Sequence, residues 1–336
     1  MANWENYVWS KYLPSIELNV CVKNKEEFFA TMIERQEIWK RRFLMHKPAP
    51  WTEDKILRDY KFTNVYRELD RSSQWMLQNI TTDENLDLKN VVWKQMVYRY
   101  FNSPNAFQYA IDNGIWRNGI PDYAEYNEDQ FADVISTVRS NGLNPFTNAY
   151  YINNTSLSNP GKGRDWHYSH RVIPTLHDCF DDLYCLIKNA DSPKQIFDIL
   201  CLLPGSGAFI AHEFYQDYTY IPRYTGKKLM RFTQNDFTNV GPGASLGLRL
   251  IYPSLRTQES GIYVLRDESP KYLTGKFSYL NWDIKNHRYF TTNTGEITLH
   301  QIEMWLCEYS KYWKMKTGNG RQRSTFKPQS KELYKW

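Results

Sequence analysis

One stretch of the chain has residue types that can bind a phosphate group: Leu203-Pro204-Gly205-Ser206-Gly207-Ala208-Phe209-Ile210-Ala211. Gly205 and Gly207 permit positive φ and close approach by another backbone. A helix that begins here leaves its first amide N–H groups without internal partners, pointing back at the turn. These features predict a small anion site at residues Leu203, Pro204, Gly205, Ser206 and Gly207. An ordinary corner between two core helices fits the same pattern, because Pro and Gly mark many turns.

A second polar stretch lies in a segment whose pattern predicts one helix from Glu53 into the 70s. Helical spacing places several of its polar side chains on one side, where they can hydrogen-bond the edge of an extruded base and its phosphate. A solvated face with internal Arg–Asp and Arg–Glu pairs is the alternative. The side chains of this predicted pocket are Tyr60, Lys61, Asn64, Arg67 and Arg71.

A third stretch, Phe232 to Ala244, places a carboxylate shortly before a predicted helix. Pro242 fits the first turn of that helix, which we expect to run to about Tyr252. Asp236 lies on the preceding loop, which we expect to point at the N-terminus of the helix. The same loop offers Asn239 to the predicted pocket, and Gly241 and Gly243 again permit a close backbone approach. Because Asp is a favoured N-cap, a purely capping role is the alternative.

The C-terminal stretch 314–336 is basic. Its Arg321 and Arg323, between Gly318, Gly320 and Lys327, suit a phosphate backbone. A solubilising terminus is the alternative interpretation.

Helical spacing of apolar residues recurs through most of the chain, and strand alternation is scarce. We therefore expect a mainly α fold, organised as a single unit over residues 1–336 with approximate lobes 26–142 and 170–320 around a cleft. The first 25 residues and the segment from Pro253 to Asn293 are expected to be irregular, and the section around Phe107 to Asp122 is expected to be looser. The expected helices cover about 26–45, 53 into the 70s, a stretch that begins at Asn85 or Asp87, 127–140, 174–190, two helices around the 203–207 turn, 242–252, and a last helix capped by Thr298 and Gln301.

The composition is compatible with a nucleic-acid enzyme. The formal net charge is +5, which suits a polyanion partner without being diagnostic, and aromatic residues make up 16% of the chain. Aromatic faces stack on bases, although any single ring more often fills a core. The five cysteines show no zinc or iron–sulfur spacing, so we expect no metal site. Without a signal peptide or a long apolar run, we expect a cytoplasmic protein that does not contact a membrane.

The turn at Leu203 to Gly207, together with the two helices expected around it, forms a helical hairpin. It resembles the helix-hairpin-helix of DNA glycosylases, which commonly has the sequence Leu-Pro-Gly-x-Gly. In those enzymes an aspartate opens the next helix as Asp-x-Asn-Val or Asp-Thr-x-Val, and Asp236-Phe237-Thr238-Asn239-Val240 is similar. The interval from Gly205 to Asp236 is longer than usual, which implies an insertion around Tyr220 to Arg231. The resemblance also implies a monovalent cation at main-chain carbonyls of the hairpin, and no other cofactor.

A broader resemblance covers most of the chain. The blocks Tyr60 to Gln74, Leu203 to Ala211, Asp236 to Leu250 and Leu306 to Arg323 resemble the alpha-glutamyl/putrescinyl thymine pyrophosphorylase family. That family has a glycosylase-like helical fold and is linked to hypermodified bases in phage DNA. A similar helical module accompanies a hydroxymethyluracil DNA kinase. A kinase domain is not apparent here, because the basic turn at Gly161-Lys162-Gly163 lacks the order of a P-loop.

The resemblance implies a monofunctional DNA glycosylase that flips a hydroxymethylated or glucosylated pyrimidine out of phage DNA and leaves an abasic site. Asp236 would stabilise the sugar cation and orient a water molecule. Phe209 stands where strand-cutting members carry a lysine, so no Schiff base can form there. The expected partner is double-stranded DNA with modified pyrimidines, in a bacterial or phage-infected cell, and the expected oligomeric state is a monomer.

Two alternatives remain open. In one, an amine or amino acid displaces pyrophosphate from the methyl carbon of an activated 5-hydroxymethyluracil, and Lys61, Arg67 or Arg71 holds the leaving phosphates. In the other, the chain is a DNA-binding module without catalysis, and Asp236 is only a helix cap.

Overall fold

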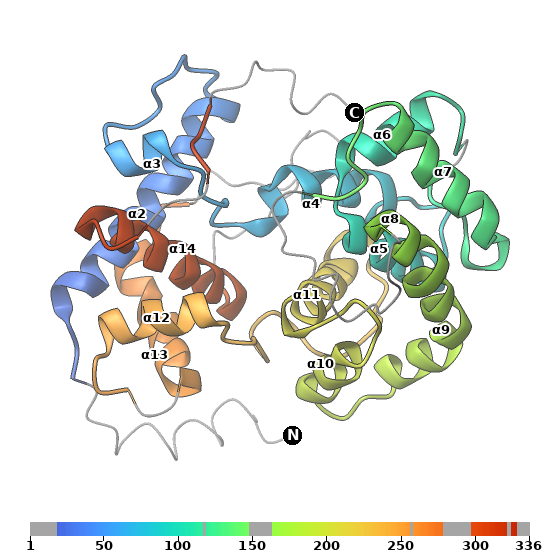
Figure 1. Ribbon diagram of the computed structural model, residues 1–336. Coiled ribbons are helices and arrows are strands. Elements are labelled where there is room, and N and C mark those ends of the chain that lie inside the picture. Colours follow the sequence, from blue (N-terminus) through green and yellow to red (C-terminus); the bar gives the residue numbers. More distant parts are fainter. Residues whose placement is uncertain are drawn as a thin grey trace. The chain divides into compact units, whose positions relative to one another are not determined.

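The computed structural model describes residues 19–116, 119–147, 163–255, 258–277, 297–320 and 324–327. Helices predominate throughout these ranges, and the β contact within them is an isolated antiparallel bridge between Tyr60 and Thr325. The prediction of a mainly α fold is confirmed. The chain forms two compact units (Figure 1). Of the described residues, unit 1 contains 19–67, 238–277 and 297–327, and unit 2 contains 68–237.

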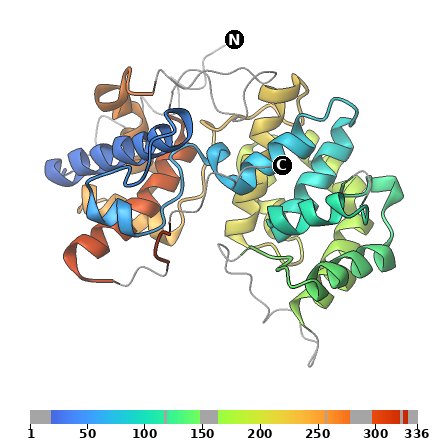
Figure 2. The same cartoon turned by 90° about the horizontal axis from the view of Figure 1, so that it is seen from above.

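Unit 1 is built around helix α14 (Leu299–Thr317), which begins at the predicted capping box of Thr298 and Gln301. Its apolar stripe is buried at Ile302, Trp305, Leu306 and Tyr309, whereas Trp313 near its end is half-buried. The helices that pack on α14 come from both ends of the chain, so blue and red ribbons lie together in Figures 1 and 2. They are α2 (Val22–Trp39, continued by the π turn Lys40–Leu44), α3 (Lys55–Asp59), α12 (Pro242–Ile251) and α13 (Gln258–Leu273).

The single helix predicted from Glu53 into the 70s is wrong. Helix α3 ends at Asp59, the chain then becomes extended, and a 3-10 turn at Arg67–Leu69 leads into α4 (Arg71–Met76). The cause is long-range pairing: Tyr60 forms the bridge with Thr325, and the Lys61 amide donates to the Ser324 carbonyl at 3.2 Å. Main-chain groups that pair with another segment cannot continue a helix.

The irregular segment predicted from Pro253 to Asn293 is also wrong in part, because it contains α13. Pro270 inside this helix and Gly261 near its start lower its helix propensity. The sequence pattern therefore did not predict α13. Packing compensates for the weak propensity. Ile262, Leu265 and Leu273 are buried, and a Cβ at Gly261 would touch Leu255 and Leu248.

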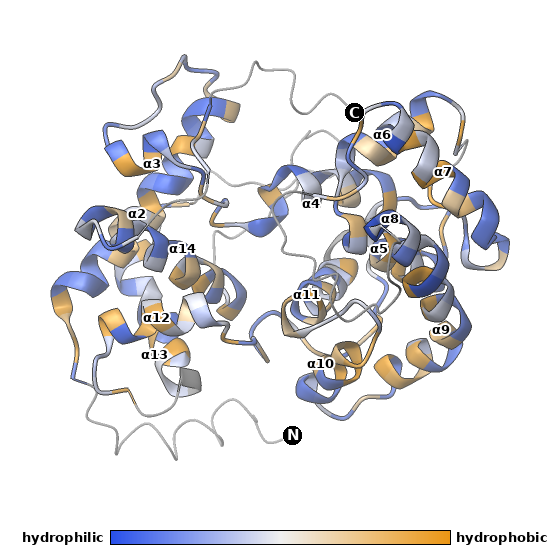
Figure 3. Ribbon diagram, viewed as in Figure 1, coloured by the Kyte–Doolittle hydropathy of each residue, from blue (hydrophilic) through white to orange (hydrophobic). Residues whose placement is uncertain are grey.

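Unit 2 is organised around α5 (Leu88–Phe101), which begins at the predicted cap Asp87 and is buried from Val91 to Phe101. The apolar stripes of α7 (Glu128–Ser140) and α9 (Ile173–Lys188) are buried as well. Figure 3 shows hydrophobic positions interspersed with hydrophilic ones along α9 and α10 (Pro193–Cys201). The other elements of the unit are α4, η4 (Leu77–Thr81), α6 (Pro104–Asp112), η5 (Tyr123–Glu125), α7 (Glu128–Ser140), α8 (Arg164–His167), η6 (Tyr168–Val172), α9 (Ile173–Lys188), α10 (Pro193–Cys201) and α11 (Ala208–Thr225).

Aromatic rings fill much of this core. Trp93 on α5 makes edge contacts with Tyr123, Tyr126 and Phe180 at centroid distances of 5.6, 5.4 and 5.3 Å. Trp75 stacks on Tyr98 at 4.7 Å. Such pairs stabilise a core beyond the area that they bury. These rings therefore serve packing, which is the alternative that composition left open.

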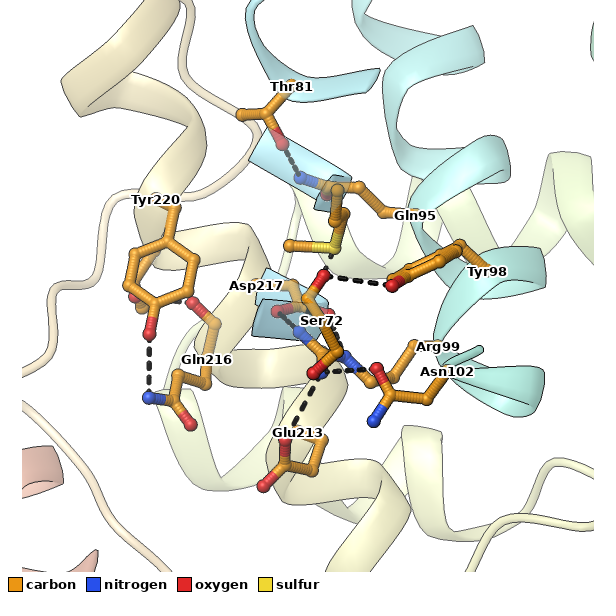
Figure 4. A network of polar contacts seen from close by, with 12 residues as sticks. Ser72, Thr81, Gln95, Tyr98, Arg99, Asn102, Glu213, Gln216, Asp217 and Tyr220 are labelled. Atoms are coloured by element: carbon orange, nitrogen blue, oxygen red, sulfur yellow. Dashed lines mark hydrogen bonds and ion pairs between the residues drawn. The ribbon is translucent and has the colours of Figure 1, made fainter. Parts of the chain in front are cut away.

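The polar face of α11 is buried against α5 in a charged network (Figure 4). Arg99 of α5 donates from Nε to Asp217 Oδ2 at 2.7 Å and from Nη2 to Asp217 Oδ1 at 2.5 Å. Its Nη1 donates to Asn102 Oδ1 at 3.2 Å and lies 3.6 Å from Glu213 Oε2. The side chains of Arg99, Glu213 and Asp217 are only 1%, 2% and 1% exposed. A bidentate ion pair between Arg99 and Asp217 therefore joins α5 to α11 inside unit 2.

Asp217→Asn is expected to lower the free energy of unfolding by about 3 kcal/mol, because it removes one partner of a buried charge pair and leaves Arg99 undercompensated. Urea unfolding followed by circular dichroism measures this change. Asp198→Asn is the matched control, since Asp198 pairs with Lys194 on the exposed face of the neighbouring α10. This control should change stability by less than about 1 kcal/mol. Equal effects of the two substitutions would contradict the structural role of the network.

Candidate nucleic-acid interface

The predicted helical hairpin is present in unit 2. Helix α10 begins at Ser192, whose side chain accepts the Gln195 amide, and Pro193 occupies its first turn. Gly205 has φ of +71°, the left-handed conformation that favours glycine. Gly207 is extended, with φ −134°, and serves as the N-cap of α11. The inner face of α11 is fully buried at Ala211, Phe214, Tyr215 and Tyr218.

The inner side of the turn is fixed by aromatic side chains. The Tyr100 hydroxyl donates to the Pro204 carbonyl at 2.9 Å. A Cβ at Gly205 would lie 3.1 Å from the Tyr168 hydroxyl and 3.3 Å from Val172, so only glycine fits there without displacement. Burial raises the pKa of Tyr100 well above its ordinary value, and the phenol stays a neutral donor at physiological pH. The turn is therefore held rigidly against α5 and η6.

The outer side of the turn is exposed. Gly207, Ala208 and Phe209 are exposed, and the N-cap residue Gly207 has no side chain that could accept an amide of α11. The first turn of this 18-residue helix therefore receives no capping oxygen from its own N-cap residue. Leu202 and Phe209, which are 84% and 48% exposed, flank it. Exposed amides next to exposed apolar side chains are suited to a partner with both phosphate and apolar surfaces.

Asp236 lies on a loop that packs on the same hairpin. Phe237 contacts Phe197 of α10 and Tyr215 of α11 at centroid distances of 5.3 and 5.6 Å. The Asp236 carboxylate is exposed and accepts the Thr233 amide at 2.6 Å and the Thr233 hydroxyl at 2.7 Å. The carboxylate thus closes a local turn. Asp236 lies on the loop before α12, as expected, but the N-cap of α12 is Gly241, so the alternative that Asp236 only caps this helix is wrong.

The predicted pocket residues do not share one helix face. Tyr60 is half-buried beside Thr325, and Lys61 is exposed. Asn64 and Arg67 are buried in unit 1, where Arg67 Nη1 lies 3.3 Å from Met304 Sδ. Arg71 belongs to unit 2 and donates to Asn105.

The second pair of glycines accommodates protein rather than an open surface. The Gly241 amide donates to Glu303 Oε1 of α14 at 3.1 Å. A Cβ at Gly243 would lie 2.5 Å from Cys307 Sγ on the same helix. The close approach that these glycines permit is thus made by α14. Asn239 is half-buried in the segment before α12.

The remaining expectations concern the basic C-terminal stretch, metal binding, membrane contact and oligomeric state. Arg321 and Arg323 lie outside the described residues, whereas residues 324–327 are described. Among the described residues, no group of three or more His, Cys, Asp or Glu side chains is arranged to hold a metal ion. Within the same ranges, no helix has the length and apolarity needed to span a membrane. The expected monovalent cation and monomeric state stay predictions.

A cavity of about 190 Å³ opens in unit 2 among α4, η4, α5 and α6. It is smaller than the roughly 300–1,000 Å³ typical of small-molecule sites. Lys94 on its wall is held by Asp122 at 2.6 Å. The cavity is therefore too small for a nucleotide, and its charged side chain already has a partner. Its lining residues are Trp75, Asn79, Ile80, Lys94, Ile111, Gly119 and Ile120.

The charged network of Arg99, Glu213 and Asp217 between α5 and α11 was not predicted from the sequence. A signal was present, because Arg99 interrupts the apolar run Val97-Tyr98-Arg99-Tyr100-Phe101. The polar positions 212, 213, 216 and 217 also follow helical spacing, but a solvated helix face has the same pattern. Only the pairing of residues 118 positions apart distinguishes the two cases.

Comparison with known proteins identifies relatives of the chain. The family described as "5-hmdU DNA kinase, helical domain" matches residues 23–322. A protein of Bacillus phage SP10 described as "5-hmdU DNA kinase" is 26% identical over 321 residues, covering 90% of this chain and 48% of the relative. The chain thus spans about half the length of that curated relative. No solved structure matches the chain, and the glycosylase-like arrangement stays a prediction.

These findings overturn the predicted activity. A glycosylase breaks the bond between base and sugar, whereas the matched family and relative are described as DNA kinases. The prediction of a hydrolase is therefore wrong. The first alternative, amine transfer, agrees with that description only in being a transferase reaction. The second alternative, a module without catalysis, does not include phosphate transfer. The part of the resemblance that concerned a hydroxymethyluracil DNA kinase and phage DNA modification is supported. With 23–322 matched, this chain belongs to the family of the helical domain of 5-hmdU DNA kinases.

Proposed function

We propose that the chain binds DNA containing 5-hydroxymethyluracil and takes part in phosphoryl transfer to the 5-hydroxymethyl oxygen. The observation that carries this proposal is the family match over residues 23–322. The phage relative, described as a kinase for this nucleoside in DNA, supports it.

The chemistry requires positioning more than covalent participation by the protein. The hydroxymethyl oxygen attacks the terminal phosphorus of a nucleoside triphosphate, a new O–P bond forms, the bond to the leaving diphosphate breaks, and the hydroxyl gives up its proton. Rate enhancement depends on holding the DNA in register with the incoming phosphoryl group. A rigid DNA-binding platform is therefore a necessary part of such an enzyme.

Within that reaction we assign the DNA side to this chain. Its 336 residues contain no G-x-x-x-x-G-K-[ST] motif, which is the signature of one common phosphate-donor site. The hairpin, in contrast, presents the glycine-capped N-terminus of α11 to a backbone phosphate, on a turn fixed on its inner side by Tyr100 and Tyr168. The exposed Leu202 and Phe209 would contact the adjoining sugars.

The hairpin contact predicts the effect of one added charge. Ala208→Glu places a carboxylate at the exposed first position of α11, where it favours the helix dipole but repels a phosphate. Affinity for duplex DNA should fall about tenfold, while thermal stability stays unchanged or rises slightly. Ala208→Gln is the matched neutral control and should bind like the wild type. Fluorescence anisotropy with a labelled duplex measures both. Wild-type affinity of the Glu variant would exclude the turn as a phosphate site.

The base preference tests the proposed function itself. Two duplexes that differ only in one hydroxyl, with 5-hydroxymethyluracil or thymine at a single position, are titrated against the chain. The hydroxymethyl duplex should bind about fivefold more tightly, the magnitude of one net hydrogen bond. After incubation, nucleoside mass spectrometry should show no free base and no abasic site. Equal affinities would contradict recognition of the modified base, and released base would contradict a role in phosphoryl transfer.

A further inference from the structure

A second surface, in unit 1, has the composition of a DNA contact. The segment that ends α2 and follows it, residues 38–51, contains four Lys or Arg residues and no Asp or Glu. Its Leu44, Met45, His46 and Lys47 are all exposed. We refer to residues 40–51 as the basic loop. No expectation from sequence assigned a role to it.

The basic loop is closed by its own hydrogen bonds. The Met45 and Lys47 amides donate to the Lys40 and Arg41 carbonyls, each at 2.9 Å. At the far end, Trp51 Nε1 donates to the Lys47 carbonyl at 2.7 Å, and Arg41 Nη1 donates to the Trp51 carbonyl at 2.6 Å. A loop tied at both ends loses little conformational entropy when it binds a partner.

Aromatic rings hold one arginine of the loop and join it to the C-terminal segment. The Arg42 guanidinium lies over Phe43, Trp51 and Phe326, at 4.7, 4.9 and 5.6 Å from the ring centroids. Phe326 is fixed in turn, because its amide donates to the Asp59 carbonyl at 2.8 Å. Lys327, the next residue, is exposed. The loop and residues 324–327 therefore form one basic and aromatic surface.

Two adjacent apolar side chains are exposed next to these charges. Leu44 is 42% exposed and Met45 is 48% exposed. His46 follows with φ of +50°, an uncommon conformation that sharply turns the chain. Leu and Met side chains at such positions act as wedges against base steps in architectural DNA-binding proteins, with Arg and Lys beside them on the phosphates.

We propose that this surface is a second, sequence-independent contact to duplex DNA. Lys47 and Lys327 neutralise backbone phosphates, and Leu44 and Met45 pack against a base step. Lys40 and Arg41 pair with Glu37 and Glu34 of α2, so the positive charge of Lys47 and Lys327 selects DNA as the partner. The inference rests on the proposed DNA-binding function for that choice. The contact differs from the hairpin, since it lies in the other unit and adds affinity without reading the modified base.

Salt dependence separates the two kinds of contact. Each lost phosphate contact reduces the slope of log K against log salt by about 0.9, because fewer counterions are released. The double variant Lys47→Gln/Lys327→Gln should therefore bind more weakly at low salt and have a slope smaller by about 1.8. Leu44→Ser/Met45→Ser should lose about tenfold in affinity at every salt concentration with an unchanged slope, since no charge is removed.

Matched controls lie at the opposite end of α2, about 27 Å away for an 18-residue helix. Lys23→Gln and Val22→Ser remove an exposed charge and an exposed apolar side chain there, and both should leave affinity and slope unchanged. Circular dichroism confirms folding of every variant. Each titration uses both the thymine and the hydroxymethyluracil duplex, and the loop variants should weaken both equally.

The outcomes separate this inference from the proposed function. If the loop variants bind like the wild type, or no more weakly than the controls, the surface is not a DNA contact, even where the wild type still prefers the modified duplex. If the wild type binds the thymine and hydroxymethyluracil duplexes equally tightly, the proposed function is contradicted instead. A loop variant that loses affinity for the modified duplex alone would contradict a sequence-independent contact.

Discussion

The pairing of Arg99 with Asp217 is the interaction on which the rest of unit 2 depends. It joins α5, which is buried from Val91 to Phe101, to α11, the helix whose first turn forms the outer side of the hairpin. Two charged groups without access to water are stable only when they are held in a fixed geometry. The bidentate contact between Arg99 and Asp217 holds them so, with Asn102 accepting from Arg99 and Glu213 nearby. The direction of α11, and hence of its amides, is fixed by this pair and by the Tyr100 contact to Pro204.

Local signals allowed much of the fold to be predicted. The caps Asp87, Asn127 and Thr298 act within one turn of their helices, so residue types locate these helix starts closely, although Asn85 was an equal candidate at α5. Gly205 was equally predictable, since its positive φ follows from the turn. The segment around Tyr60 was not, because its conformation is decided by pairing with Thr325, far away in sequence. Arg99 was missed for the same reason.

The functional prediction went wrong at a different level. A hairpin with exposed amides is suited to a phosphate whatever reaction follows, so it indicates a partner and not a chemistry. The aspartate that supported base excision has a sufficient local role, since Asp236 accepts two hydrogen bonds from Thr233. Only the similarity over nearly the whole chain to the helical domain of 5-hmdU DNA kinases distinguishes phosphate transfer from excision. Both chemistries need a protein that grips DNA beside a modified pyrimidine.

Hydrogen–deuterium exchange across residues 203–211 tests the central claim most directly, because it reports on the amides that the account assigns to a DNA phosphate. The account predicts that a duplex with a single 5-hydroxymethyluracil slows exchange at the start of α11, and that it does so at a lower DNA concentration than the thymine duplex. Unchanged exchange in this segment at a DNA concentration that saturates binding would contradict the claim.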